Sequence, residues 1–280
     1  MIKTFLVRGM LVGIVAGLLA FGFGKLFGEP QIDRAIAFEE QMDKAKEAEA
    51  KPPSDQVKAP AEEMKGMDMS KGMVMSKNEA AEPELVSRAV QSSVGLLTGV
   101  VVYSTAFGGL FSLAFAFAYG RLGHLGPRAT SAVLAAAGFV SIVLVPALKY
   151  PANPPAIGEP ETIGYRTALF FAMLVISIAA LSMAVILARR LVASYGAWNS
   201  ALMGGAAFVI IIAICQLVMP DINEVPEGFS ATVLWRFRMA SFGTQIVMWT
   251  TIGLLFGALT ERSLSRQGSL TGRHRVASLG

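Results

Sequence analysis

Acidic side chains in three polar loops are the residues of this sequence whose types and spacing are suited to chemistry. A loop that combines carboxylates with prolines offers a divalent cation both carboxylate and backbone carbonyl oxygens. The prolines in residues 149–155 remove N–H donors and leave an extended chain with free carbonyls. If the three loops meet at one mouth, their acids form a vestibule that attracts cations. The candidate metal ligands are Glu29, Asp33, Glu159, Glu161, Asp221 and Glu224.

The same carboxylates have a second interpretation as structural ion pairs. Basic partners stand in or beside the same loops: Arg88, Arg166, Arg236 and Arg238. The last two belong to a cluster of aromatic and arginine residues at 235–238, which is typical of an anchor at a membrane boundary. Under this interpretation the proline-rich stretch is a stiff connector between helices. The residues alone leave both interpretations open.

A methionine run offers a different kind of metal ligand: Met64, Met67, Met69, Met73 and Met75. Thioethers are soft ligands that suit Cu(I), so a copper-handling protein is an alternative function. The surrounding residues 51–83 are rich in Pro, Lys, Glu and Ala, a composition typical of a linker that does not fold on its own. The methionines then have no role beyond that composition.

Long apolar stretches predict that the chain crosses a membrane. The sequence is 54% hydrophobic, too apolar for an ordinary soluble domain. A helix needs about 20 apolar residues to cross the hydrocarbon core. Six stretches meet or approach that length: residues 5–27, 94–119, 131–148, 167–187, 200–219 and 239–259. We therefore expect an all-α integral membrane protein with about six transmembrane helices and both termini on the same side.

The charged residues divide unequally between the two sides of this predicted membrane. One set of loops holds ten Lys/Arg and a single acid, Glu261, while the other holds fourteen Lys/Arg and nineteen Asp/Glu. The positive-inside rule makes the first set cytoplasmic. This distribution also explains the high pI without nucleic acid as a partner. Both histidines, His124 and His274, fall on the cytoplasmic side, away from the acidic loops.

The first apolar stretch has two interpretations. Lys3 and Arg8 before an apolar core resemble a secretory signal peptide, which would leave five spans after cleavage. Against cleavage, the stretch is long and residues 20–24 are a poor cleavage site. Gly9, Gly13 and Gly17 form a small-residue stripe that favours close packing against another helix. We expect the span to be retained.

Four regions follow from this pattern. Residues 1–27 form the first span, and residues 28–93 form a periplasmic loop with an acidic helix over about 31–50 followed by the methionine-rich linker. Residues 94–260 form a five-span bundle, and residues 261–280 form a basic cytoplasmic tail.

The predicted spans contain little that could react. No Asp, Glu, Lys or His stands at mid-span, so a proton relay has no evident carrier. Polar residues such as Tyr103, Gln216 and Gln245 are candidates for interhelical hydrogen bonds or for lining a polar route. Cys215 is the only cysteine, so no disulfide or thiolate cluster forms within one chain. No motif of a hydrolase or a nucleotide-driven motor is present, and we expect neither an enzyme nor a resident cofactor.

Several longer motifs resemble the CbtA family of predicted cobalt transporter subunits. They are residues 27–39 (FGEPQIDRAIAFE), 88–95 (RAVQSSVG), 119–123 (YGRLG) and 148–166 (LKYPANPPAIGEPETIGYR). The resemblance covers most of the chain apart from the linker and the tail. It implies a protein of the bacterial inner membrane that supplies cobalt for cobalamin synthesis together with a small single-span partner, CbtB.

Combining the residues with the resemblance, we expect a membrane permease subunit for uptake of a divalent transition metal cation, most specifically Co²⁺. The lipid bilayer and the CbtB-type subunit are the expected partners, and a homo-oligomer is compatible with the sequence. Two alternatives stay open. One is the copper-handling protein described above, and the other is a non-transporting membrane scaffold whose outer loops bind another protein.

Overall fold

The chain folds into a bundle of helices. The structure is a computed structural model and describes residues 2–50, 86–155 and 157–277. Within these ranges the regular elements are helical, with no strand. The α-helices are α1 (Ile2–Phe23), α2 (Glu29–Ala50), α3 (Arg88–Val90), α4 (Leu96–Ala118), α5 (Pro127–Gly138), α6 (Val145–Lys149), α7 (Ile163–Val218) and α8 (Ala231–Ala277). Short π-helical turns join α1 to α2, α3 to α4 and α5 to α6.

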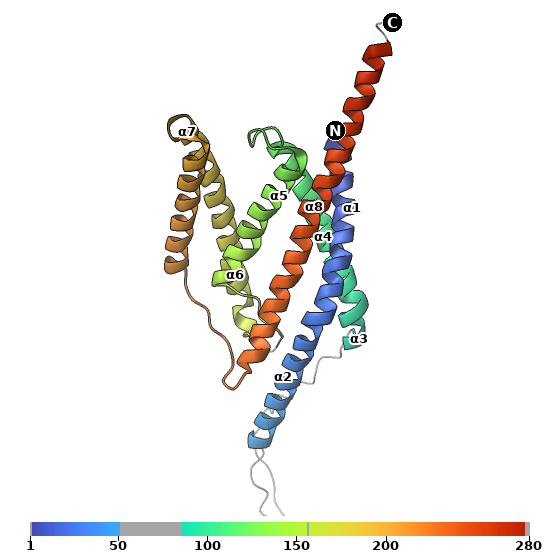
Figure 1. The fold of residues 1–280 in the computed structure, drawn as a ribbon. Coiled ribbons are helices and arrows are strands. Elements are labelled where there is room, and N and C mark those ends of the chain that lie inside the picture. The colour runs from blue at the N-terminus through green and yellow to red at the C-terminus, as the bar shows by residue number, and fades with distance from the viewer. Residues whose placement is uncertain (1, 51–85, 156, 278–280) are drawn as a thin grey trace, which may run out of the picture.

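Five helical segments are long and apolar enough to cross a membrane. The longest, which includes α7, folds back on itself at Gly196, where a φ of 75° breaks the helical path. Figure 1 shows the two limbs of α7 side by side. These limbs contain the fourth and fifth predicted spans. Large apolar side chains such as Leu217 and Phe117 are 86% and 71% exposed, which suits a surface covered by lipid rather than water.

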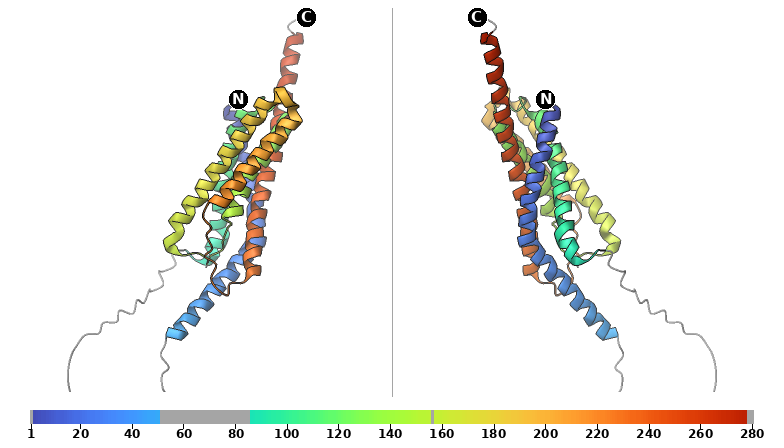
Figure 2. Two further views of the ribbon diagram at one scale, coloured as in Figure 1. Left: turned by 90° about the vertical axis from the view of Figure 1, so that its left-hand side faces the viewer. Right: turned by 90° about the vertical axis from the view of Figure 1, so that its right-hand side faces the viewer.

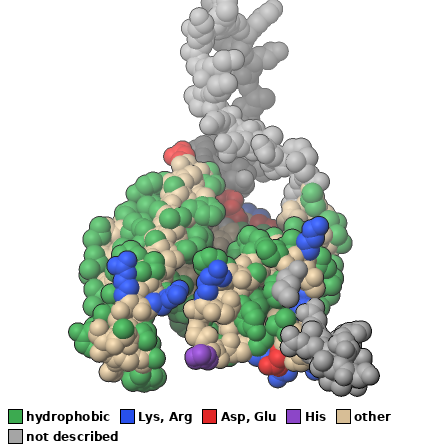
Figure 3. Space-filling view, turned by 90° about the horizontal axis from the view of Figure 1, so that it is seen from above, with side chains coloured by type: hydrophobic (Ala, Val, Ile, Leu, Met, Phe, Trp, Pro, Cys, Tyr) green, Lys and Arg blue, Asp and Glu red, His purple; other side chains and the backbone are tan. Residues whose placement is uncertain are grey.

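The two ends of the bundle differ in charge. Both termini and the Gly196 turn lie at one end, which we name the basic end (Figure 1). Its basic residues include Lys3, Arg8, Arg121, Arg128, Arg189, Arg190, Arg262 and Arg266. Figure 3, seen onto this end, shows Lys and Arg side chains scattered among apolar ones. The six candidate carboxylates lie at the opposite end, which we name the acidic end.

The closest packing in the bundle is the contact between α1 and α4. Gly9, Gly13 and Gly17 are buried there, as the small-residue stripe predicts. A Cβ on Gly13 would lie 2.4 Å from the carbonyl oxygen of Ser104, and one on Gly108 would lie 2.2 Å from that of Gly9. The two backbones therefore touch, and only glycine fits at these positions.

Two apolar cores hold the remaining helices. The larger core joins α1, α4, α5 and α8 around fully buried Phe115 and Phe256, whose rings meet edge to face at 5.1 Å. The smaller core joins α6 to both limbs of α7 around Met173 and Ile212. Polar contacts add to the larger core, because Ser131 on α5 donates a hydrogen bond to the Gly253 carbonyl on α8 at 2.6 Å.

The first span continues beyond the bundle as a polar helix. The π-helical turn Gly24–Gly28 carries α1 directly into α2, without the loop expected near residue 28. Figure 2 shows α2 projecting past the acidic end of the bundle. The helix predicted over about 31–50 is therefore present and begins earlier. The methionine run at 64–75 lies outside the described residues.

Candidate functional site

Three segments that are far apart in the sequence meet at the acidic end through a small apolar cluster. Ala35 of α2, Ile157 of the second outer loop and Phe229 of the third are buried together. The ring of Phe38 meets Phe229 edge to face, with centroids 4.9 Å apart. This cluster explains why the three acidic loops converge: each contributes an apolar residue that is shielded from water only when all three meet.

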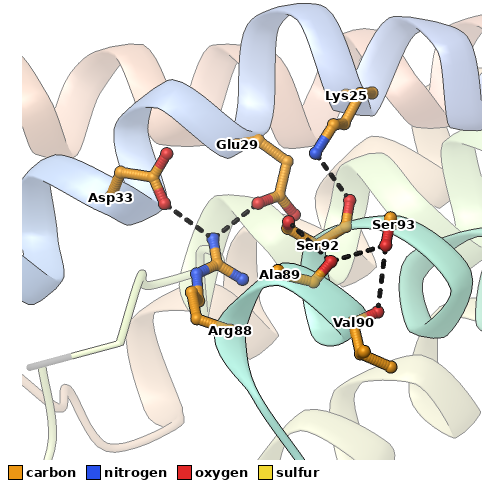
Figure 4. Close-up of polar contacts among 8 residues, drawn as sticks. All are labelled: Lys25, Glu29, Asp33, Arg88, Ala89, Val90, Ser92 and Ser93. Atoms are coloured by element: carbon orange, nitrogen blue, oxygen red, sulfur yellow. Dashed lines mark hydrogen bonds and ion pairs between the residues drawn. The ribbon is translucent and has the colours of Figure 1, made fainter.

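The first pair of candidate carboxylates, Glu29 and Asp33, is bound to one arginine (Figure 4). Nη2 of Arg88 lies 2.5 Å from a Glu29 carboxylate oxygen and 3.0 Å from one of Asp33. The two acids are neighbours because they stand four residues apart on α2. The Glu29 side chain is 7% exposed and that of Asp33 is 64% exposed, so Arg88 compensates one buried and one solvated charge.

A second ion pair ties the second outer loop to the third. Nζ of Lys149 donates to Asp221 at 2.5 Å and to the Gln216 carbonyl at 2.7 Å. The neighbouring Tyr150 hydroxyl donates to the Pro220 carbonyl at 2.9 Å. Because the Lys149 side chain is 8% exposed, its ammonium depends on these acceptors.

Glu224 is held by the proline-rich loop. One of its oxygens accepts a hydrogen bond from the Glu159 N–H at 3.0 Å and lies 3.2 Å from Nε of Arg166. Arg166 also donates to the Glu159 carbonyl. The guanidinium packs against Gly158, where φ is 111° and a Cβ would lie 2.2 Å from Nη1. Only glycine allows the arginine to lie this close to the loop.

The contacts of Glu224 make the stability of the fold depend on pH. The Thr162 hydroxyl, the Glu159 N–H and the Arg166 guanidinium lower the pKa of Glu224, outweighing the opposite effect of desolvation. A lowered pKa in the folded state stabilises the fold above the unfolded value, about 4.3, and this stabilisation is lost as the pH falls below it. We expect the unfolding free energy of the wild type to fall more steeply below that pH than that of Glu224→Gln. Denaturant titrations at stepwise pH measure this difference, and an equal slope in the two proteins would contradict the prediction.

The remaining candidate ligands, Glu159 and Glu161, are exposed. Neither carboxylate has an ion pair or hydrogen bond to the rest of the chain that the structure describes. Glu161 lies in the 3₁₀ turn Pro160–Thr162, which leads into α7. Among the six candidates these two are therefore the carboxylates that the described part of the chain leaves unpaired.

The six carboxylates do not form one cluster. Within the described ranges, no group of three or more His, Cys, Asp or Glu side chains is placed to hold a metal ion. Four of the candidates instead take part in the ion pairs of Arg88, Lys149 and Arg166. Arg88 and Arg166 fit the ion-pair interpretation, whereas the partner of Asp221 is a lysine that the sequence did not suggest.

A cavity of about 490 Å³ begins beside these loops and extends between the helices. Glu224 and Arg166 line its outer part, and Tyr103 of α4 and Gln245 of α8 line its inner part. Oε1 of Gln245 and Nε of Arg238 are buried without a hydrogen-bond partner in the part of the chain that the structure describes. Polar atoms left in this way are available to a ligand.

Two polar residues have roles that the sequence left undecided or missed. Arg238 was expected to anchor the chain at the membrane boundary, but its Nη2 donates to the Asn153 amide oxygen at 2.9 Å and it lines the cavity. Gln216 is an interhelical partner, because it donates to the Val145 carbonyl at 3.1 Å. Gln245 of α8 is also an interhelical partner, because its side chain is hydrogen-bonded to that of Tyr103 on α4, and both residues line the cavity.

The five apolar helical segments and the lipid-suited surface define a multi-pass membrane protein. A scan of protein-family models matches residues 2–261 to CbtA, described as a probable cobalt transporter subunit. The chain belongs to this family, as its motifs indicated. Comparisons with curated proteins and with solved structures found no match.

Proposed function

We propose that this chain is the permease subunit of a cobalt uptake system and that Co²⁺ approaches from the acidic end. The observation that supports this most directly is the cavity, which begins beside exposed Glu159 and Glu161 and reaches Gln245 between α4 and α8. The family to which the chain belongs is one of probable cobalt transporter subunits. The excess of basic residues at the other end favours placing that end in the cytoplasm and the acidic end in the periplasm.

The six carboxylates have different roles in the proposed uptake of Co²⁺. Exposed Glu159 and Glu161 attract the cation, and Glu224 is the carboxylate it meets at the cavity wall. Glu29, Asp33 and Asp221 hold the loops in place through their ion pairs and add to the negative field of the acidic end. The backbone carbonyls of residues 149–155 assist as oxygen ligands, apart from that of Pro154, which accepts a hydrogen bond from the Ile157 N–H.

The guanidinium groups of Arg166 and Arg238 oppose the passage of a cation through this chain alone. Arg166 and Arg238 both line the cavity, whereas Glu224 is the one acidic lining residue among those that the structure describes. A bare divalent cation is repelled by the excess positive charge. We infer that passage requires the partner subunit, of the CbtB type, to supply ligands or to displace these arginines. The word subunit in the family description supports such a partner.

The test is cellular metal content, measured by mass spectrometry at trace external metal with and without the chain and its partner. Cobalt should rise with the wild type. In Glu159→Gln/Glu161→Gln, present at normal levels, the uptake rate should fall roughly 10-fold at low ionic strength and less in high salt, because steering by exposed charges is screened.

Glu227→Gln is the control, because Glu227 is an exposed acid of the same end that lies in the third outer loop and not in the proline-rich loop; its effect is compared per charge removed. An equal loss in this control would contradict the assignment to Glu159 and Glu161. No change in any metal would favour the scaffold alternative. A change confined to copper would favour the methionine run.

A further inference from the structure

The largest cavity among those described is a groove of about 950 Å³ between α1 and α8 at the basic end, away from the cavity proposed for the cation. Its walls are mainly apolar, and among the described residues every charged one that lines it is basic. Leu11 and Val15 of α1 face Leu255 of α8 in the groove. The basic lining residues include Lys3, Arg8 and Arg262.

The polarity of the groove changes along the membrane normal. Leu11, Val15 and Leu255 lie towards the middle of the bundle, whereas Lys3 and Arg262 lie nearer its basic end. Arg8 stands between the two regions and donates from Nη1 to the Thr260 hydroxyl at 3.2 Å, which joins α1 to α8 beside the groove. The nearby acid, Glu261, does not line the groove and is paired with Arg128 of α5. An apolar interior with a cationic mouth complements a molecule with an apolar tail and an anionic head.

The length of the groove distinguishes a lipid from a protein helix. Its lining residues on α1 run from Lys3 to Val15, about 18 Å at 1.5 Å per residue. The hydrocarbon core is about 30 Å thick, so the groove covers roughly one leaflet. A transmembrane helix of a partner needs about 20 residues and would extend far beyond it.

We propose that this groove binds one anionic phospholipid from the leaflet at the basic end. The acyl chains lie against Leu11, Val15 and Leu255, and the phosphate lies between Lys3 and Arg262 with Arg8 below it. Basic pockets between membrane helices on the cytoplasmic side are suited to such headgroups. The bound lipid bridges α1 and α8, and this role does not depend on which ion the protein carries.

The test uses the full chain in nanodiscs of mixed phosphatidylglycerol and phosphatidylcholine, followed by native mass spectrometry of the lipids retained after transfer to mild detergent. The wild type should retain phosphatidylglycerol in preference. Lys3→Gln/Arg262→Gln should lower this preference roughly 30-fold, because each of the two basic residues near the surface contributes about 1 kcal/mol. Both residues are exposed, and neither forms an ion pair within the part of the chain that the structure describes, so the fold should persist.

Arg189→Gln/Arg190→Gln is the matched control, with the same loss of charge at the same end but outside the groove. It should retain the wild-type preference. A second variant, Leu11→Trp, fills the apolar part and should lose the lipid while every charge remains. Equal losses in the two double variants, no preference in the wild type, or displacement of the bound lipid by inorganic phosphate would each overturn the proposal.

Discussion

Gly13→Ala should destabilise the protein by about 3 kcal/mol. The new methyl group would lie 2.4 Å from the Ser104 carbonyl oxygen and 2.8 Å from the Cα of Thr105, so it can be accommodated only if α1 and α4 separate. Overpacking a tight contact costs about 1–3 kcal/mol, and a backbone partner has no rotamer with which to relieve it. The unfolding free energy, measured by titration with SDS in mixed micelles, reports the effect.

Gly22→Ala provides the control for this prediction. Gly22 lies on the same helix, but a Cβ there would have no atom within 4 Å. Its stability should stay close to that of the wild type or rise slightly, because alanine favours the helix. If both variants were equally stable, the two helices would not touch through their backbones. The separation of α1 and α4 in Gly13→Ala should also move Tyr103, which precedes Ser104 and lines the cavity; under the proposed function, cobalt uptake by this variant should therefore fall as well.

Arg88→Gln should cost about 3 kcal/mol because it leaves a buried carboxylate without its partner. The Glu29 side chain is 7% exposed and lies 2.5 Å from Arg88. Breaking a buried ion pair by removing one member costs about 3–5 kcal/mol, whereas replacing both members is often nearly neutral. The double variant Glu29→Gln/Arg88→Gln should therefore recover much of the stability that Arg88→Gln loses. A double-mutant cycle of unfolding free energies measures the coupling between the two residues.

Asp33 supplies an internal comparison for this cycle. It contacts the same arginine at 3.0 Å, but its side chain is 64% exposed. Exposed ion pairs contribute about 0.2–1 kcal/mol, so Asp33→Asn should have a small effect and a weak coupling to Arg88. Equal coupling of Glu29 and Asp33 to Arg88 would show that burial does not set the strength of these pairs. It would also return Glu29 to the set of carboxylates available to a cation.

The sequence places the six candidate ligands correctly at the acidic end but does not show their partners. Residue type and loop membership identify these six acids, and all six lie at that end. Their partners, however, are remote in the sequence: Glu29 and Arg88 are 59 residues apart, and Lys149 and Asp221 are 72 apart. Which acid meets which base depends on how the loops pack through Ala35, Ile157 and Phe229, and a pattern within one loop does not contain that information.

The sequence by itself determined the helical class, the apolar segments, the separation of charge between the two ends and the glycine stripe of α1. These properties are local, because hydropathy and small-residue spacing act within a single helix. Only the tertiary structure decided that Gly13 meets Ser104, that Arg238 faces a cavity, and that α1 and α8 leave a groove between them. Those outcomes depend on the relative positions of helices that are distant in sequence. Close packing allows few relative positions of these helices, and the contacts that select one of them cannot be predicted from any single segment.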